Sequence, residues 1–327
     1  MSLRHDMLRA AARAFRRRPE AAARVAAFLR ASALPDGGFA NRAGASDLYY
    51  TVFGLQTLGA LRGGSGAPPR DDASEPATIF SEPADRDALR GGSPDPPRNN
   101  ASTVPYLRSF GAAASLDFVH TACLARCWAL VAGRAPDEET RRAILARLET
   151  WRSAGGGYNP EAGDRAGTAY AGFLALGAYE DFEARLPDAA GLVRSLAGLR
   201  SSDGGYANTP EAARGSTSAA AAALVTLKEL GQPVNRRAAD WLLAQHCPEG
   251  GFRAMPAAPI PDLLSTATAL HALAQAGVSF GEIRRPCREF VEGLWGEAGG
   301  FGGHWADEAA DCEYTFYGLL ALGHLAE

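Results

Sequence analysis

The sequence lacks long apolar runs and has a single lysine, Lys228. Its longest apolar stretches, such as residues 219–225, are far too short to span a bilayer. The basic amino-terminal segment, residues 1–30, has neither the apolar core nor the small-residue cleavage site of a signal peptide. We therefore expect a soluble, cytoplasmic protein with no membrane span.

Positive charge is not in excess either. The 33 Lys and Arg residues are outnumbered by 37 Asp and Glu residues, so the net charge is -4 and no nucleic-acid partner is expected. The five cysteines form no CxxC pair and are odd in number, which predicts reduced thiols and not a disulfide framework. With 46% hydrophobic and 21% charged residues, the composition suits a large folded core.

Glycine is abundant, and it marks a repeat. A Gly-Gly-aromatic tripeptide occurs five times, ending at Phe39, Tyr158, Tyr206, Phe252 and Phe301. Each copy is followed by a threonine and an apolar run rich in Ala and Leu. A sixth copy is expected at Phe110, where Arg108 and Ser109 replace the glycines. Six repeats with one insertion, between the first and the second, then account for the chain.

Each repeat predicts a pair of helices. The first is amphipathic: residues 138–152 place Ile144, Leu148 and Trp151 on one face. The second is apolar around most of its circumference, as in residues 217–227, and should therefore be buried on all sides. The last repeat is as apolar as the middle ones, which favours a closed ring over an open solenoid.

The predicted fold is therefore all-α, an (α/α)6 barrel or toroid with inner and outer helices, in one domain over residues 1–327. A Pro- and Gly-rich insertion, residues 63–100, separates repeats 1 and 2. Two interpretations of it stay open, a lid over one end of the barrel or an irregular excursion.

Carboxylates recur just before the predicted inner helices, and their positions are Asp47, Asp117, Asp164, Asp262 and Asp311. We interpret them as helix N-caps, because repetition suits a structural role better than a single active site. His120, Cys123 and Cys127 share one helical face, which we interpret as a polar stripe facing a cavity. Aromatic residues on the inner helices should line that cavity, which should be wide beside the alanines of residues 219–223.

These motifs carry a resemblance. The pattern Gly300–Gly303, Asp311 and then Tyr314–Leu319 resembles the repeat of protein prenyltransferase β subunits, the catalytic halves of farnesyl- and geranylgeranyltransferases. The repeats are more distantly similar to those of squalene–hopene cyclases, although no DxDD acid motif occurs here. The resemblance implies an isoprenoid diphosphate in a central apolar cavity, prenyl transfer to a thiol or other acceptor, a catalytic zinc ion and a helical α-subunit-like partner.

The implied zinc ligands are only partly present. Asp262 matches the family's aspartate, but Leu264 stands where the family has cysteine and Tyr314 where it has histidine. We therefore predict no zinc at the usual site. A second set of weak metal candidates comprises Asp311, Cys312 and His304.

The resemblance also suggests contacts to the substrate. Arg214 and Arg253 are the candidate diphosphate contacts. Tyr50, Tyr170, Tyr314 and Tyr317 are the candidate contacts to the isoprenoid chain. Three functions remain open: a prenyltransferase-like enzyme, a non-catalytic barrel that binds an isoprenoid lipid or a protein, and a terpene cyclase-like enzyme.

Overall fold

The structure is a computed structural model that describes residues 2–17, 19–64, 103–131, 135–161, 163–164, 166–307 and 309–326. From residue 65 onward the predicted insertion lies outside the described residues. No helix in the described ranges is long and apolar enough to cross a membrane.

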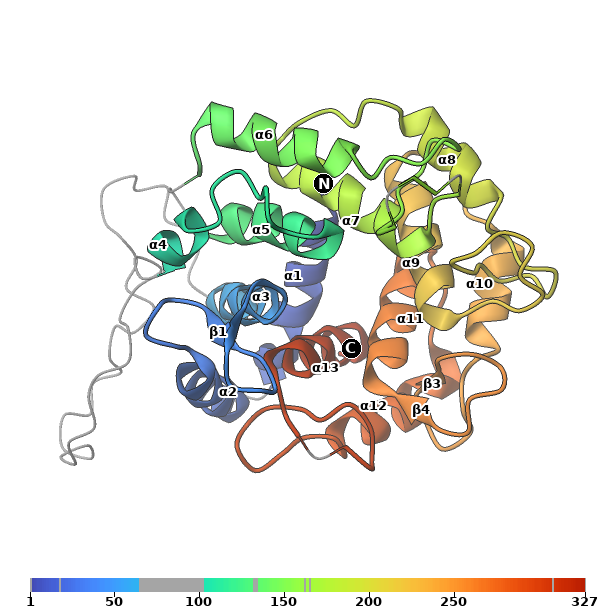
Figure 1. Cartoon of the computed structure of the whole chain (residues 1–327). Helices are drawn as coiled ribbons and strands as arrows, with labels where there is room; N and C mark the ends of the chain where they lie inside the picture. The colour runs from blue at the N-terminus through green and yellow to red at the C-terminus, as the bar shows by residue number, and fades with distance from the viewer. Residues whose placement is uncertain are drawn as a thin grey trace.

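Six inner helices form a closed ring (Figure 1). They are α3 (Leu48–Gly64), α5 (Phe118–Leu130), α7 (Ala169–Asp181), α9 (Thr217–Glu229), α11 (Leu263–Gln275) and α13 (Cys312–Leu325). Each inner helix contacts the next one along the chain, and α13 returns to contact α3. The predicted closure is confirmed.

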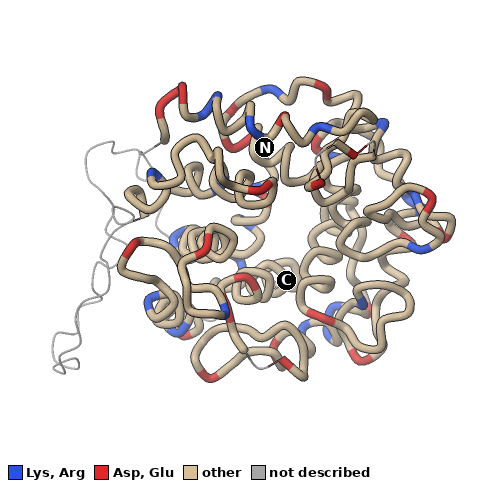
Figure 2. Tube along the Cα trace, in the orientation of Figure 1, with Lys and Arg blue, Asp and Glu red and all other residues tan. Residues whose placement is uncertain are grey.

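Six helices surround this ring, one before each inner helix. They are α2 (Pro19–Ser32), α4 (Thr103–Arg108), α6 (Glu138–Glu149), α8 (Ala189–Ala197), α10 (Arg236–Leu243) and α12 (Arg284–Glu292). Within α6, Ile144 and Leu148 are fully buried against the ring while the opposite face is exposed. Figure 2 shows the consequence, since charged residues mark mainly the outer helices and loops and the inner ring is largely uncharged. The predicted division into inner and outer helices is confirmed.

The Gly-Gly-aromatic turn is tied to the inner helix by a threonine. The backbone N–H of Phe39 donates to Thr51 Oγ1 at 2.9 Å, and Phe252 and Thr266 form the same bond at 2.9 Å. In repeat 1 the aromatic ring then lies on Gly54, where a Cβ atom would come within 2.6 Å of it. Glycine is therefore required on the inner helix wherever the aromatic ring packs this closely.

Short antiparallel hairpins complete the turns of repeats 1 and 5. Strand β1 (Phe39–Ala40) pairs with β2 (Ser46–Asp47), and β3 (Phe252–Arg253) pairs with β4 (Pro261–Asp262). In repeat 2 the aromatic residue Phe110 packs edge-on against Tyr106 of α4, with ring centroids 5.0 Å apart.

The N-cap prediction is confirmed at four of the five aspartates. Each accepts a backbone N–H in the first turn of an inner helix, and the four are Asp47, Asp117, Asp262 and Asp311. It is wrong for Asp164, whose carboxylate instead accepts from the Asn159 side chain at 3.0 Å. The N-cap of α7 is Thr168, and Ser216 caps α9 in the same way. Thr168 and Thr217 are therefore not equivalent to Thr51 and Thr266. In repeats 3 and 4 the inner helix begins at or next to the threonine, whereas in repeats 1 and 5 the threonine lies four residues after the N-cap.

A thirteenth helix lies outside the repeat pattern, and the sequence did not predict its place. Helix α1 (Leu3–Arg13) packs against α3 and α13 and reaches α7 (Figure 1). The Leu3 N–H donates to the Glu180 carboxylate at the carboxyl-terminal end of α7. Ala10 lies against Gly323 near the end of α13. Helix α1 therefore covers the end of the ring at which the inner helices finish.

Candidate functional site

Two positions on every inner helix face the ring axis. The first is the second helical residue after the N-cap, and across the ring these residues are Tyr49, Val119, Tyr170, Ser218, Leu264 and Glu313. The second lies one turn deeper, and its residues are Phe53, Cys123, Leu174, Ala222, Thr268 and Tyr317. We call these twelve residues the axial face.

The orientation of the axial face follows from which helices interact across it. The Tyr170 hydroxyl on α7 lies close enough to affect the pKa of Tyr49 on α3 and of Tyr317 on α13. Helix α7 does not adjoin α3 or α13 in the ring, so these three side chains are directed toward the inside of the ring. All six residues at the first axial position are partly exposed to solvent. The outer helices and the neighbouring inner helices cover the other sides of each inner helix.

The axial face has an open side and a filled side. One turn below the rim, Leu174, Ala222 and Thr268 are still partly exposed on α7, α9 and α11. At the same depth on α3, α5 and α13, Phe53, Cys123 and Tyr317 are buried. The second axial residue is therefore more accessible to solvent on α7, α9 and α11 than on α3, α5 and α13.

Aromatic rings fill the opposite side. The ring centroids of Tyr49 and Phe53 on α3 are 5.0 Å apart, and Phe53 lies 5.3 Å from Tyr317 and 6.1 Å from Phe316 on α13. We call these four residues the aromatic wall. Offset and edge-to-face rings at such distances attract one another, so the wall is a rigid apolar surface.

Glu313 is the only carboxylate on the axial face, and it lies beside the aromatic wall. Its Oε1 accepts a hydrogen bond from the Tyr49 hydroxyl at 2.5 Å. Burial raises the pKa of the Glu313 carboxyl, and the nearby charge of Asp311 acts in the same direction. Sequence reasoning missed this residue, although counting two positions from each N-cap would have placed it on the axis.

The structure separates the four tyrosines predicted to bind substrate. Tyr170 and Tyr317 belong to the axial face. Tyr50 packs against Tyr49 at the rim, with ring centroids 5.7 Å apart, and Tyr314 lies beneath the Arg42 guanidinium at 5.4 Å. The first pair therefore lies on the axial face, and the second pair lies at the rim.

The two predicted diphosphate contacts lie on the side of α9 and α11. Arg214 is exposed in the loop before α9, and Arg253 is half-buried on β3. Neither forms an ion pair within the described ranges. The amino-terminal turn of α9 is already served by the Ser216 hydroxyl, and the Asp203 carboxylate accepts the Gly215 N–H at 3.2 Å.

The other half of the rim is acidic. This half lies near α3, α5 and α13. Here the Arg42 guanidinium forms ion pairs with Asp307 and Asp311, each at 2.8 Å. His120 lies between the carboxylates of Asp117 and Asp47, at 2.9 and 3.6 Å. An anionic head group is therefore disfavoured on this half.

Burial disfavours the thiolate form of the two cysteines that follow His120. Burial raises the pKa of Cys123 to about 12, and Cys127 is fully buried behind it with a raised pKa. Cys123 reaches the axial face, as predicted for the polar stripe. The Cys127 thiol instead points to the Leu48 carbonyl, 3.9 Å away.

The residues present do not fit the zinc ion that the resemblance implies. Asp262 uses its carboxylate on the Ser265 backbone and hydroxyl, at 2.7 Å each, and its predicted partner positions hold Leu264 and Tyr314. Asp311 caps α13 and binds Arg42, whereas Cys312 is buried with its pKa raised to about 12. The described ranges contain no group of three or more His, Cys, Asp or Glu that could hold a metal ion. His304, the remaining candidate, accepts the Ala306 N–H through its ring nitrogen at 3.1 Å.

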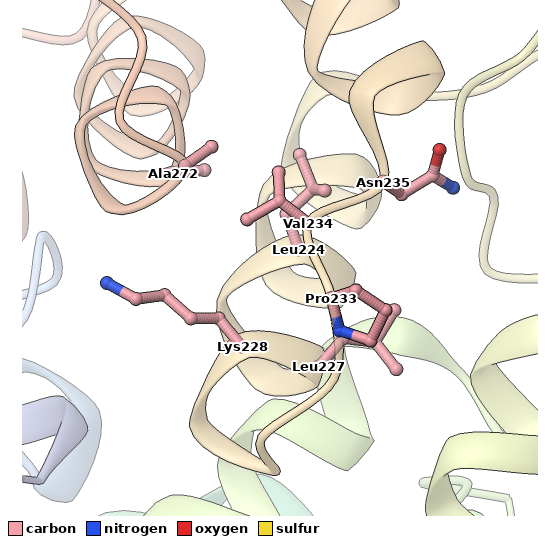
Figure 3. A pocket seen from close by; sticks show the side chains of 8 residues that line it. Leu224, Leu227, Lys228, Pro233, Val234, Asn235 and Ala272 are labelled. Carbon is pink, nitrogen blue, oxygen red and sulfur yellow. The ribbon is translucent and has the colours of Figure 1, made fainter.

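A small pocket lies on the flank of the ring (Figure 3). It is lined by the carboxyl-terminal half of α9, the following loop and α11, through Leu224, Leu227, Lys228, Pro233, Val234, Asn235, Ala272 and Ala276. Its cavity volume of about 10 Å³ holds about one water molecule and leaves no room for a small-molecule ligand. None of these residues belongs to the axial face.

Comparison with known proteins identifies the class. The family defined as the prenyltransferase alpha-alpha toroid domain matches residues 14–78, 122–232 and 218–326, and the chain belongs to this family. No curated protein matches the sequence.

Several solved structures are similar to this chain. The type II terpene cyclase MstE from Scytonema, in complex with geranylgeranyl dihydroxybenzoate, is 13% identical, and the match covers 99% of this chain and 98% of that chain with a TM-score of 0.57. A protein from Actinoplanes is 16% identical over 94% of this chain and 99% of that chain, with a TM-score of 0.55. Protein geranylgeranyltransferase-I from Candida albicans, complexed with GGPP, is 14% identical over 64% of this chain and 66% of that chain, with a TM-score of 0.47.

Proposed function

We propose that this protein binds an isoprenoid chain on the axial face of its inner helices. The observation that carries the proposal is the asymmetry of this face, with an aromatic wall on α3 and α13 and a solvent-accessible surface of small residues on α9 and α11. An isoprenoid chain placed between them would bury apolar surface worth about 25 cal/mol per Å². The geranylgeranyl ligand of the MstE structure supports this class of ligand.

Charge sets the orientation of the chain. A diphosphate or other anionic head group belongs beside Arg214 and Arg253, because the rim near α3, α5 and α13 carries Asp47, Asp117 and Asp311. Opposite charges attract and like charges repel across a partly dehydrated site. The tail then runs from the α9 and α11 side toward the aromatic wall.

Prenyl transfer to a thiol or another acceptor is the second candidate function. The two arginines favour it, because stabilising a leaving diphosphate is its main catalytic demand. Transfer would then proceed without the zinc ligands of the β subunits, and the acceptor or a helical α-subunit-like partner would approach the open end of the ring.

A thermal-shift titration with geranylgeranyl diphosphate and geranylgeraniol tests the proposal, because the two ligands share a tail and differ in charge. We expect both to stabilise the wild type saturably. Ala222→Phe should abolish both shifts by filling the open side, and its matched control Ala146→Phe, on the exposed face of α6, should not. Removing Arg214 and Arg253 together should weaken only the diphosphate. Absence of a shift with either ligand would contradict the proposal.

A further inference from the structure

Two histidines on neighbouring inner helices form a buried pair at the end of the ring that α1 covers, which we call the closed end. Nδ1 of His271 on α11 and Nε2 of His324 on α13 are 3.0 Å apart, and the ring centroids are separated by 5.1 Å. The two residues are only 5% and 9% exposed. They lie about two turns beyond Leu264 and about three turns beyond Glu313, so they continue the axial direction toward the closed end.

Helix α1 encloses this pair. Gly323, directly before His324, meets the Ala10 carbonyl of α1 so closely that no side chain would fit between them. Arg13 of α1 lies near enough for its charge to act on both histidines. The pair is therefore held between α11, α13 and α1, and it becomes open to solvent when α1 moves away.

The short contact limits the number of protons that the pair can hold. A hydrogen bond between two ring nitrogens needs one of them as acceptor, and a protonated imidazole has no acceptor, because both of its nitrogens are donors. Burial lowers the pKa of His271 to about 4 and holds that of His324 well below its usual range. The packed state therefore needs at least one neutral ring and favours two.

The charges around the pair also disfavour its protonation. Arg13 and Lys228 of α9 lower the pKa of His271, and Asp6 of α1 raises it. Asp6 is already bound to Arg9, with 2.6 Å between guanidinium and carboxylate. Among the described side chains, the helices that contact α11 or α13 also carry Glu229 on α9 beside Glu180 of α7, Arg62 at the end of α3, the exposed Arg236, Arg237 and Asp240 of α10, and Arg284 and Arg288 of α12, which donate to carbonyl groups at the end of α13. Asp6 is the one carboxylate that acts on the pair within the described part of the chain.

We propose that the His271–His324 pair is a pH-sensitive switch that keeps α1 on the closed end near neutral pH and releases it under acidic conditions. In the released state both rings are open to solvent and take up protons near the ordinary histidine pKa of about 6.5. In the packed state protonation is disfavoured down to a much lower pH. Because the released state binds protons more tightly, its population rises as the pH falls below about 6.5. The switch acts without a ligand, so it does not rest on the isoprenoid binding proposed above.

Release can be local because α1 is a terminal element outside the repeats. It contacts the inner helices α3, α7 and α13 and is joined to α2 through the short helix η1 (Ala14–Arg17). The repeats keep their own caps and turns when α1 leaves. Since Leu3, Met7 and Ala10 are buried in the packed state, acidification would expose an apolar helix face that is covered at neutral pH.

The Glu180 carboxyl at the same end cannot cause this response. Its pKa is raised by burial, so its titration favours the packing of α1 at lower pH. A loss of α1 packing on acidification has the opposite sign and therefore reports on the histidines.

Hydrogen–deuterium exchange of the full-length protein without ligand tests the switch, with α9 as the internal reference. After correction for the intrinsic effect of pH on exchange, the protection of α1 relative to α9 should fall about 10-fold between pH 7.5 and pH 5.5. A single histidine whose pKa falls from about 6.5 to about 4 on packing changes the equilibrium by this factor. The double variant His271→Gln with His324→Gln should lose less than about 2-fold, because glutamine does not titrate yet offers a donor and an acceptor. His5→Gln removes an exposed histidine of α1 itself and, as the matched control, should respond like the wild type.

Three outcomes would overturn the proposal. Equal relative protection of α1 at the two pH values in the wild type would show that the pair does not control packing. Simultaneous loss of protection in α1 and α9 would indicate global unfolding, and an unchanged acid response of the double variant would place the titrating group elsewhere.

A second measurement on the wild type decides the question if the double variant has already lost α1 packing at pH 7.5. Exchange of the C2 hydrogens of the imidazole rings reports the titration of each histidine. His271 and His324 should titrate over the same pH range in which α1 loses its protection. Titration of both rings near pH 6.5 while α1 stays protected would overturn the proposal.

Discussion

The two ends of the ring differ in how the ends of the inner helices are capped and covered. At the amino end, each inner helix presents unpaired N–H groups, and these are satisfied by side-chain caps that leave the axis open to solvent. At the carboxyl end, helix α1 covers the ring and buries Leu3, Met7 and Ala10. The proposed ligand site thus lies at the amino end, whereas the close packing of α1 lies at the carboxyl end.

The closed end depends on close packing and buried charge. Ala10 meets Gly323 at a distance that leaves no room for a side chain. The Asp181 carboxylate at the end of α7 is 1% exposed and binds two guanidinium groups, Arg4 from α1 and Arg126 from α5. His271 and His324 add a buried pair with ring nitrogens 3.0 Å apart. The open end has no comparable buried ion pair among the described residues.

The largest effect should come from forcing α1 off the ring. In Gly323→Ala the new Cβ atom would lie 1.7 Å from the Ala10 carbonyl oxygen, so backbone must move. We expect a loss of about 3 kcal/mol in the free energy of unfolding, measured by urea denaturation. Gly59→Ala is the matched control, because its Cβ atom would meet only the flexible Leu8 side chain, at 3.3 Å. Equal stabilities for the two variants would contradict the tight fit of α1.

Ion pairs at the two ends should differ next. Arg126→Met leaves the buried Asp181 with one partner, and we expect a loss of about 2 kcal/mol. Arg42→Met removes a guanidinium that is 42% exposed at the open end and should cost about 1 kcal/mol or less. Chemical denaturation at low and high salt separates them, since only the exposed pair should weaken with salt. A larger loss in Arg42→Met would contradict the larger contribution of the ion pair at the closed end.

The sequence predicted the open end better than the closed end. The glycines, the threonines and the capping aspartates all recur with the repeat, so their roles could be inferred from repetition. Helix α1 occurs once, and the sequence of Leu3–Arg13 does not predict which surface its apolar face covers. The surface that α1 covers is determined by glycines and small residues of the inner helices, such as Gly323, which lie far from α1 in the sequence.

The axial residues were predicted only in part for a related reason. Aligning the repeats on threonine misplaced repeats 3 and 4, because Thr168 is an N-cap whereas Thr51 lies inside its helix. Aligning them on the caps places Tyr170 and Glu313 at equivalent positions. Glu313 adjoins Tyr314 in sequence, yet the two differ by about 100° around the helix, so only the first belongs to the axial face.

The last comparison concerns Glu180, a carboxyl at the closed end whose titration affects the stability of the fold. Burial raises the pKa of Glu180 from 4.5 to about 7, and the charge of Glu229 acts in the same direction. The folded protein therefore binds this proton more tightly than the unfolded chain. Stability from this group is complete below pH 4.5 and is lost as the pH rises toward 7.

Glu180→Gln should remove that loss, because the amide stays neutral and its oxygen can still accept the Leu3 N–H. We expect the melting temperature of the wild type to fall between pH 5 and pH 8 by about 2 °C more than that of the variant, since partial exposure of the group reduces the effect to less than about 1 kcal/mol. Glu139→Gln, on the exposed side of α6, is the control and should follow the wild type. If Glu180→Gln also followed the wild type, titration of Glu180 would not be the cause of the fall in melting temperature. Helix α1 would then be anchored by the Asp181 ion pairs and its apolar face alone.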